Sequence, residues 1–207
     1  MVHGYHAIMS FYGFWLPNDP RGSWSTWIRN WELLRFGPAT KVETRHSVAG
    51  AKCDHRQRLA AKAALKYPPV VLNGVQAKTV GLAFKTAIEE GGYRCYACSI
   101  LPEHVHLVFG RHRRKIEGIL THLRSSATRK LNADGFNPML QFKTPAGYVP
   151  TLWTHGEWKV FLNSVPDMNR AIRYVENNPV KEGKRRQNWT MVGPYPHSDV
   201  TAGKPRR

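Results

Sequence analysis

The stretch Ile100-Leu101-Pro102-Glu103-His104-Val105-His106-Leu107-Val108-Phe109 indicates how the chain folds. A proline turn followed by an apolar run predicts a β-strand. Because side chains alternate between the two faces of a strand, His104 and His106 project to one face. Val105 and Leu107 then point to the opposite face, into a core. Two imidazoles side by side on one sheet face form half of a site for a divalent metal.

The charge of the chain is its strongest bulk property. Its 207 residues suit one domain with insertions, and 31 Lys and Arg face only 14 Asp and Glu, a formal net charge of +17. This excess favours a polyanionic partner, with nucleic acid ahead of an anionic membrane. Seven Trp and eight Tyr suit stacking on unpaired bases. A basic protein that is merely soluble is the alternative.

Several classes of protein are disfavoured by the sequence. Residues 1–16 are too polar for a signal peptide, and no apolar run is long enough to span a bilayer. Three cysteines give no disulfide framework, so we expect a protein of the reducing cytoplasm. With DNA as its polyanionic partner, it would be associated with the nucleoid. Cys95 and Cys98 form a C-x-x-C, but three residues apart on a strand they should face opposite sides. We therefore interpret them as small buried apolar residues.

The order of the expected elements predicts the fold class. From hydrophobic periodicity, capping residues and turn residues we expect strands at 3–15, 93–100, 104–109 and 152–162, and helices at 54–66, 73–90, 113–131 and 166–178. The strand at 152–162 contains a hairpin around Gly156, and the last helix ends near Asn178 because Pro179 follows. The prediction is an α+β, ferredoxin-like sandwich with a central antiparallel sheet and helices on one face.

The remaining segments complete the expected organisation. One domain spans 1–190, with an insertion at 18–72 after the first strand. A basic Pro/Gly-rich tail at 191–207 is expected to be flexible. Within the insertion, the tryptophans from Trp24 to Trp31 are interpreted as a local core. His6 carries no pattern that assigns it a role.

The last helix offers the groups that a histidine pair lacks. Tyr174 and Asn178 are four residues apart and share one helix face. A helix packed on the sheet would bring that face over His104 and His106. Asn178 would then give the metal an oxygen, and Tyr174 would be a candidate nucleophile towards a phosphodiester that the metal polarises. The chain has no P-loop and no G-x-G-x-x-G motif, so no nucleotide cofactor is expected.

Four segments carry a resemblance to a known family: LPEHVH at 101–106, AIRYVENNPVKEG at 171–183, FYGFWLPNDPRGSW at 11–24 and HLRSSATRKLN at 122–132. Together they resemble the single-tyrosine HUH (histidine–hydrophobic–histidine) transposases, in particular the REP-associated tyrosine transposases related to IS200. The resemblance extends over about residues 4–189. It implies a fold of the type expected above and an enzyme that nicks and rejoins single-stranded DNA at imperfect hairpins such as REP palindromes.

The same resemblance implies roles for individual residues. His104 and His106 match the two metal-binding histidines, Tyr174 the nucleophile, and Asn178 the third metal position, where related transposases often have glutamine. The metal is Mg²⁺ or Mn²⁺, and the products are a 5′-phosphotyrosine and a free 3′-hydroxyl. Insertion-sequence members are dimers and REP-associated members can be monomers, so both states stay open.

Basic residues near these motifs are predicted to contact the DNA backbone, with an affinity that falls steeply with salt. They are Arg111, Arg113, Arg114, Lys115, Arg124, Arg129, Lys130, Lys181, Lys184, Arg185 and Arg186. The lack of neighbouring carboxylates argues against internal ion pairs. Two other functions remain open. One is a non-catalytic protein that binds structured nucleic acid with the same fold, and the other is a metallonuclease in which water attacks.

Overall fold

The computed structural model describes residues 1–44 and 48–197. A four-stranded sheet forms its centre, in the order β2-β3-β1-β4, with every neighbouring pair antiparallel. The strands are β1 (Gly4–Ser10), β2 (Cys95–Ile100), β3 (His104–Gly110) and β4 (Trp158–Leu162). This order and the strand–helix sequence confirm the α+β, ferredoxin-like sandwich.

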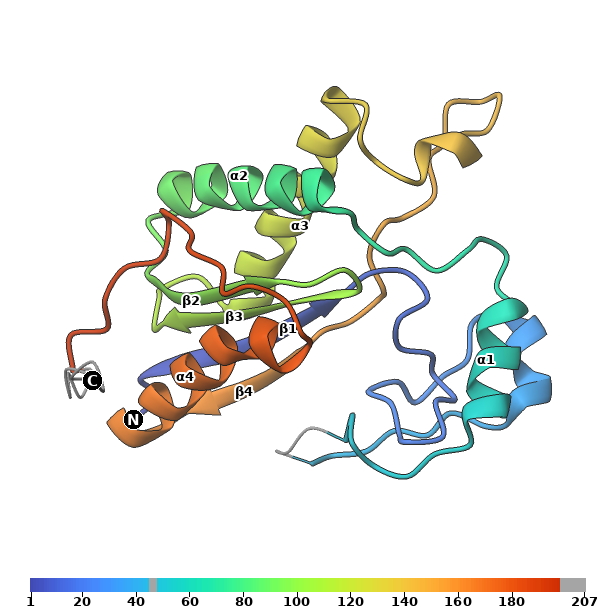
Figure 1. The fold of residues 1–207 in the computed structure, drawn as a ribbon, viewed down its shortest axis with the longest axis horizontal. Coiled ribbons are helices and arrows are strands. Elements are labelled where there is room, and N and C mark those ends of the chain that lie inside the picture. The colour runs from blue at the N-terminus through green and yellow to red at the C-terminus, as the bar shows by residue number, and fades with distance from the viewer. Residues whose placement is uncertain (45–47, 198–207) are drawn as a thin grey trace.

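The long helices cover both faces of this sheet, which corrects the expectation that they share one face. α2 (Gly74–Gly91) and α3 (Ile116–Ala133) pack on one face, and α4 (Val165–Lys181) packs on the other (Figure 1). Side-chain alternation along β3 is the reason. Leu107 joins the main core under α2 and α3, whereas Val108 joins a second, smaller core with α4. Both faces of the sheet are therefore apolar enough to bind a helix.

Local sequence signals place the ends of α2. Asn73 and Gln76 form a reciprocal capping box at its N-terminus, in which each side chain accepts from the other residue's backbone N–H. Gly92 ends the helix in the left-handed conformation, at φ 62°. The helix expected at 73–90 is therefore confirmed to within a residue at either end.

The end of α4 differs from the prediction. The helix does not stop near Asn178 but continues through Pro179 to Lys181. Proline disfavours a helical residue before it, yet this bias is weak enough for packing to overcome. Both Asn178 and Pro179 are buried, and the N–H of Glu182 still donates to the Asn178 carbonyl at 3.3 Å. The extra turn carries the chain further along the sheet.

β2 contains an irregularity that corrects the expected orientation of its cysteines. The pairing register shifts between Cys95 and Ala97, as in a β-bulge. The extra residue reverses the side-chain alternation, so Cys95 and Cys98 both join the main core under α2 and α3. They are buried apolar residues, as expected, but on one face of the sheet instead of two.

The insertion after β1 holds a 3₁₀ helix, η1 (Trp31–Phe36), and the short helix α1 (His55–Ala63) (Figure 1). They share a small apolar core of their own, in which Leu16, Leu33 and Ala61 are buried. Trp27 and Trp31 are not part of it. Their side chains are 70% and 73% exposed, so the prediction of a tryptophan core is wrong for these two residues.

Residues 152–162 run along the free edge of β1. Trp153 bridges Phe11, a turn follows at Gly156, and β4 then pairs with β1. Both halves therefore pair with β1, whereas a hairpin was expected. A second 3₁₀ helix, η2 (Leu140–Phe142), lies in the loop that precedes them.

The chain after α4 returns to the opposite edge of the sheet. The side chain of Gln187 accepts from the Ile100 N–H and donates to its carbonyl, both at 2.7 Å. Further on, Gly193 donates to the Cys95 carbonyl, and the Tyr195 ring packs edge-on against Tyr96. Residues 191–197 of the expected tail therefore lie against β2, and 198–207 fall outside the described residues. No described helix is long and apolar enough to cross a membrane.

Candidate active site

Strand pairing places three histidines on the sheet face that α4 covers. In the β1–β3 register, Ile8 lies opposite His106 and Ser10 opposite His104. Alternation along β1 then puts His6 on the same face as both. The His104 and His106 rings are 4.9 Å apart between centroids. The β3 histidines are side by side, as the sequence predicts, and β1 adds a third.

His6 is the residue that the sequence analysis missed. Its Nε2 lies 3.2 Å from Nδ1 of His106, and the two rings are nearly parallel. His6 is buried, although it is polar and alternates with the core residue Ala7. The local signal in the sequence was a histidine at a strand position where an apolar residue would be expected. This signal does not indicate which residue the histidine contacts.

Tyr174 projects from α4 towards this group. Its ring centroid lies 5.6 Å from that of His106 and 5.7 Å from that of His6, edge-on to both. Val175, the next residue, is buried in the second core and holds this turn of the helix against the sheet. The ammonium group of Lys181 sits over the other side of the phenol ring, 4.9 Å from its centroid.

Asn178, in α4, and Glu182, at its C-terminal end, follow Tyr174 at intervals of four residues. Asn178 is buried, and its Nδ2 has no hydrogen-bond partner in the structure. Glu182 places Oε1 at 3.8 Å from Nε2 of His104. Positions i, i+4 and i+8 share one helix face, so the tyrosine, the amide and the carboxylate follow one line along the helix. The sequence analysis did not single out Glu182.

Burial keeps the imidazoles neutral. It lowers the pKa of His6 to about 4, and burial followed by repulsion from Lys184 lowers the pKa of His104 to about 4. The pKa of His106 falls well below its ordinary value because of burial and then its two neighbouring imidazoles. Burial, and then the charge of Glu182, raises the pKa of Tyr174. The site thus offers neutral nitrogen donors beside a protonated phenol.

The donor set fits a divalent cation. Nδ1 of His104 and Nδ2 of Asn178 are buried polar atoms without a partner, which is costly unless a ligand satisfies them. The two ends of an amide are interchangeable by a flip, which would put Oδ1, a metal-ligating atom, at the unpartnered position. Among the described residues no group of three or more His, Cys, Asp or Glu is arranged as metal ligands. The fit therefore depends on the asparagine.

Aromatic side chains surround the histidines. Phe14 stacks on His104 with a ring separation of 4.7 Å, and Trp158 packs edge-on against His6 at 5.1 Å. Trp24, from the insertion, contacts Trp158 in turn. The insertion is thus connected to the site through a line of rings, and these rings exclude water from the imidazoles.

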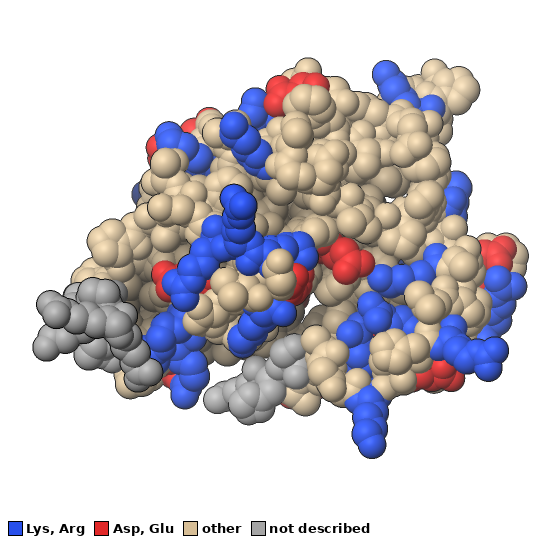
Figure 2. Space-filling view, viewed as in Figure 1, with Lys and Arg blue, Asp and Glu red and all other residues tan. Residues whose placement is uncertain are grey.

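The predicted DNA-contacting residues lie in three separate places. Lys181 and its basic neighbours at 184–186 are exposed and follow Tyr174 directly. The group at 111–115 is also exposed, but it follows the other end of β3. Seven residues of strand separate it from His104, about 23 Å at the usual rise. On the viewed face, Lys and Arg side chains gather over α4 and over the insertion (Figure 2).

The third group lies on α3, across the sheet from the histidines. Arg124 is not free, since it pairs with Glu157 at 3.1 Å and donates to the Gly156 carbonyl at 2.7 Å. The expectation that no carboxylate pairs with these basic residues is therefore wrong for Arg124, and also for Lys184, which pairs with Glu182 at 3.4 Å. Lys130 likewise pairs with Asp134 at 3.0 Å. Arg129 is exposed and, with Arg124, lines an open groove of about 480 Å³.

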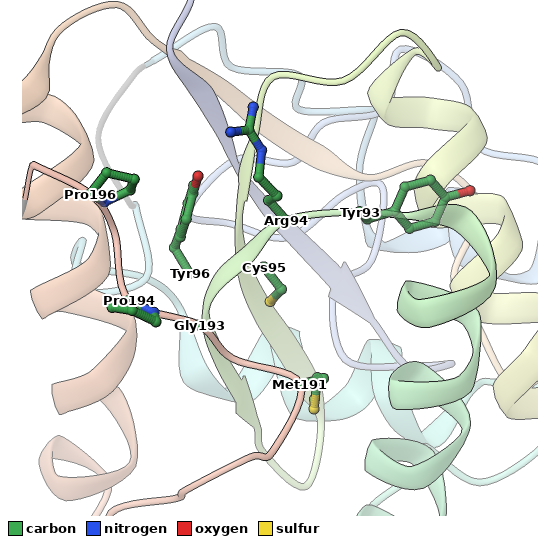
Figure 3. Close-up of a pocket in the computed structure, with 8 residues that line it drawn as sticks. All are labelled: Tyr93, Arg94, Cys95, Tyr96, Met191, Gly193, Pro194 and Pro196. Atoms are coloured by element: carbon green, nitrogen blue, oxygen red, sulfur yellow. The ribbon is translucent and has the colours of Figure 1, made fainter.

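A cavity of about 280 Å³ lies between β2 and residues 191–196 (Figure 3). It is at the Cys95 end of β2, which pairs with Phe109, whereas the histidine pair lies at the other end of β3. Cys95 lines it, and burial raises the pKa of this thiol to about 12. An un-ionised thiol is a poor nucleophile, so this cavity holds no chemistry comparable to that of the histidine site.

Comparison with known proteins gives only structural likeness. No family model and no curated protein matches the chain. Among solved structures, a REP-associated tyrosine transposase bound to a REP hairpin matches with a TM-score of 0.45 and 12% identity, over 87% of this chain and 68% of the other. A candidate transposase from Deinococcus radiodurans R1 matches with a TM-score of 0.41 and 14% identity, over 86% and 91%. Both TM-scores are low, so the function has to be inferred from the site itself.

Proposed function

We propose that the protein is a metal-dependent enzyme that nicks and rejoins single-stranded DNA at hairpins through a tyrosine nucleophile. Tyr174 attacks the phosphate, and His104, His106 and Asn178 hold the divalent ion, Mg²⁺ or Mn²⁺. The basic residues that follow α4 hold the DNA strand. In this proposal the chain acts as a transposase or a related strand transferase.

One observation carries the proposal: the Tyr174 ring lies 5.6 Å from that of His106, on the sheet face that both strand histidines share. The Tyr174 phenol packs against neutral imidazoles, and the buried Asn178 amide has a nitrogen without a hydrogen-bond partner. An interface between a helix and a sheet that served only for packing would normally bury apolar side chains or fully hydrogen-bonded polar groups. A purely structural tyrosine would not require two buried histidines packed against its ring. Polar groups that are costly to bury are typical of functional sites.

The chemistry assigns a task to each group. A divalent ion at the site would polarise the scissile phosphate and stabilise its developing charge. The Tyr174 oxygen loses its proton and forms a bond to phosphorus, while the bond from phosphorus to the 3′ oxygen breaks and that oxygen gains a proton. The result is a 5′-phosphotyrosine and a free 3′-hydroxyl, which can reverse the reaction and rejoin the strand. No external energy source is needed because one phosphodiester replaces another.

In the proposed enzyme, the raised pKa of Tyr174 makes phenolate formation dependent on the bound cation. Burial and the charge of Glu182 both favour the neutral phenol in the free protein. A bound cation is the group that would offset both effects and favour the phenolate. Lys181, over the ring, also favours the anion. In this proposal the phenol stays neutral until the metal is in place.

The test is covalent capture of a labelled DNA hairpin with a single-stranded flank, in the presence of Mn²⁺, on a denaturing gel. Wild type should form a protein–DNA adduct, and Tyr174→Phe should form none, a loss of more than about 10³-fold in rate because phenylalanine lacks the attacking hydroxyl. Tyr148→Phe is a matched control, since Tyr148 is exposed in a distant loop. An adduct that persists in Tyr174→Phe would contradict the assignment.

The same denaturing gel, together with a native gel that reports non-covalent hairpin binding, distinguishes the two other functions. Cleavage without a protein–DNA linkage, tolerant of Tyr174→Phe, would indicate a metallonuclease in which water attacks. Hairpin binding that needs no metal and never yields an adduct or cleavage would indicate a non-catalytic nucleic-acid-binding protein.

A further inference from the structure

His6 occupies a position between three elements of the proposed site. In the β1–β3 register it lies opposite Val108 and thus diagonally across from His106. Its Nε2 is 3.2 Å from Nδ1 of His106, and its ring packs against Tyr174 from α4 and Trp158 from β4. Strand pairing and packing on two sides therefore hold this ring in one orientation.

We propose that His6 is a positioning residue that accepts a hydrogen bond from Nδ1–H of His106 and so reserves Nε2 of His106 for the metal. The proposal deepens the proposed function, because it concerns the same metal site. A neutral imidazole carries one proton, on either nitrogen, and only the other nitrogen has a lone pair for a cation. A partner on one nitrogen therefore decides which nitrogen can bind.

The geometry supports an orienting role for His6 over a role as a ligand. Nε2 of His6 is the nitrogen paired with His106, so in the proposed arrangement its lone pair is already engaged. The diagonal placement on a paired strand gives a fixed distance, which a loop residue would not provide. Metal-binding histidines generally donate their second N–H to such a partner, and removing the partner weakens metal binding by about 10- to 100-fold.

Within the described part of the chain, His104 is not paired with another imidazole in this way. Its Nδ1 is buried without a hydrogen bond, and its Nε2 faces Glu182 at 3.8 Å. The two strand histidines therefore differ in how they are held: one by another imidazole in the sheet, the other by stacking on Phe14. Substitution of His6 should therefore change the orientation of the His106 ring and leave the His104 ring in place.

The direct test is the tautomer of His106 in metal-free, ¹⁵N-labelled protein, observed by NMR. The proposal expects the proton on Nδ1 in wild type and a loss of this preference in His6→Leu. Leucine is chosen because it fills space beside Tyr174 without accepting a hydrogen bond. A wild-type proton on Nε2 of His106 would overturn the proposal.

Mn²⁺ affinity, measured by electron paramagnetic resonance on the full chain, gives a second readout that does not depend on catalysis. His6→Leu should weaken binding by about 10- to 100-fold. His6→Gln, whose amide oxygen can accept from Nδ1–H, should stay within a few-fold of wild type. His122→Leu is the histidine control, since His122 bonds Tyr93 on the α2–α3 face of the molecule.

The outcomes separate the inference from the function on which it rests. Equal affinity in His6→Leu and wild type, or equal loss in the leucine and glutamine variants, would overturn the role of His6 even if the wild type forms a covalent adduct. A wild type that binds Mn²⁺ with the expected His6 dependence but never forms an adduct would overturn the strand transfer and leave the role of His6 intact.

Discussion

At the scale of single residues, the site combines polar groups with a degree of burial that they normally avoid. His6 and His106 are buried, and His104 is nearly so, although each could be satisfied more cheaply at the surface. The imidazoles avoid the larger cost of a buried charge by remaining neutral. A neutral imidazole is also the form that binds a metal, so stability and the proposed function favour the same protonation state.

The lowered pKa values predict how stability depends on pH. His6 and His104 titrate at about 4 in the folded chain and near 6.5 when unfolded. Between pH 6.5 and 4 the unfolded chain binds more protons, so the free energy of unfolding falls as the pH falls and is fully retained above 6.5. Each histidine should cost roughly 3 kcal/mol over this window, since one pKa unit corresponds to about 1.4 kcal/mol.

Urea denaturation of the metal-free protein, repeated from pH 7.5 to 4.5, measures this dependence. His104→Gln removes one of the titrating groups and should flatten the curve, whereas His3→Gln, at an exposed position, should follow wild type. A wild-type stability that does not change over this range would show that the imidazoles are not held neutral.

At the scale of the elements, α4 presents two faces to the sheet. Met168, Ala171 and Val175 bury the apolar side in the second core. The adjacent line through Tyr174 and Asn178 lies beside the histidines. Because the helix continues past Pro179 to Lys181, Glu182 follows directly at its C-terminal end. The helix thus acts as a rigid support, on which a displaced turn would move the phenol and the amide together.

Trp189, in the segment after α4, packs closely against Gly81 of α2. A Cβ at Gly81 would lie 2.1 Å from the Trp189 ring, closer than any real side-chain contact. Gly81→Ala should therefore destabilise the protein by about 1–3 kcal/mol, even though alanine favours a helix by about 1 kcal/mol. Gly74→Ala is a matched control in the same helix, because a Cβ there meets nothing within 4 Å.

Chemical denaturation of both variants provides the measurement. Since Trp189 also bonds Gln187, which pairs with the Ile100 backbone, a displaced indole should loosen the segment along β2. Faster hydrogen exchange at Ile100 in Gly81→Ala would reveal it. Equal stability of the two alanine variants would mean that Trp189 does not pack on α2 as the structure has it.

At the scale of the whole molecule, the positive charge is divided between separate places. The basic residues after α4 adjoin the proposed nucleophile, whereas the group at 111–115 follows the far end of β3. Arg124 and Lys130 on α3 are engaged in ion pairs. Only part of the net charge of +17 can therefore act near the proposed nucleophile.

This division predicts different effects for two matched double variants. Lys184→Gln/Arg185→Gln and Arg111→Gln/Arg113→Gln should each weaken hairpin binding and reduce the slope of log affinity against log salt by about 1–2, because each removes up to two phosphate contacts. Only the first pair should also slow adduct formation at saturating DNA. Fluorescence anisotropy between 50 and 300 mM salt gives the slopes, and the adduct gel gives the rates. An equal effect on the rate from both pairs would contradict the division.

Local periodicity was sufficient to predict much of this molecule. Alternation along β3 put His104 and His106 on one face, four-residue spacing put Tyr174 and Asn178 on another, and capping residues bounded α2. Each of these depends only on the backbone geometry of one element. Tertiary structure alone decided that α4 lies across the sheet from α2 and α3, that His6 contacts His106, and that the basic groups lie at different ends of the sheet. These depend on strand order and on which face each helix buries. Such choices are made by contacts between residues far apart in the sequence, and no local pattern records them.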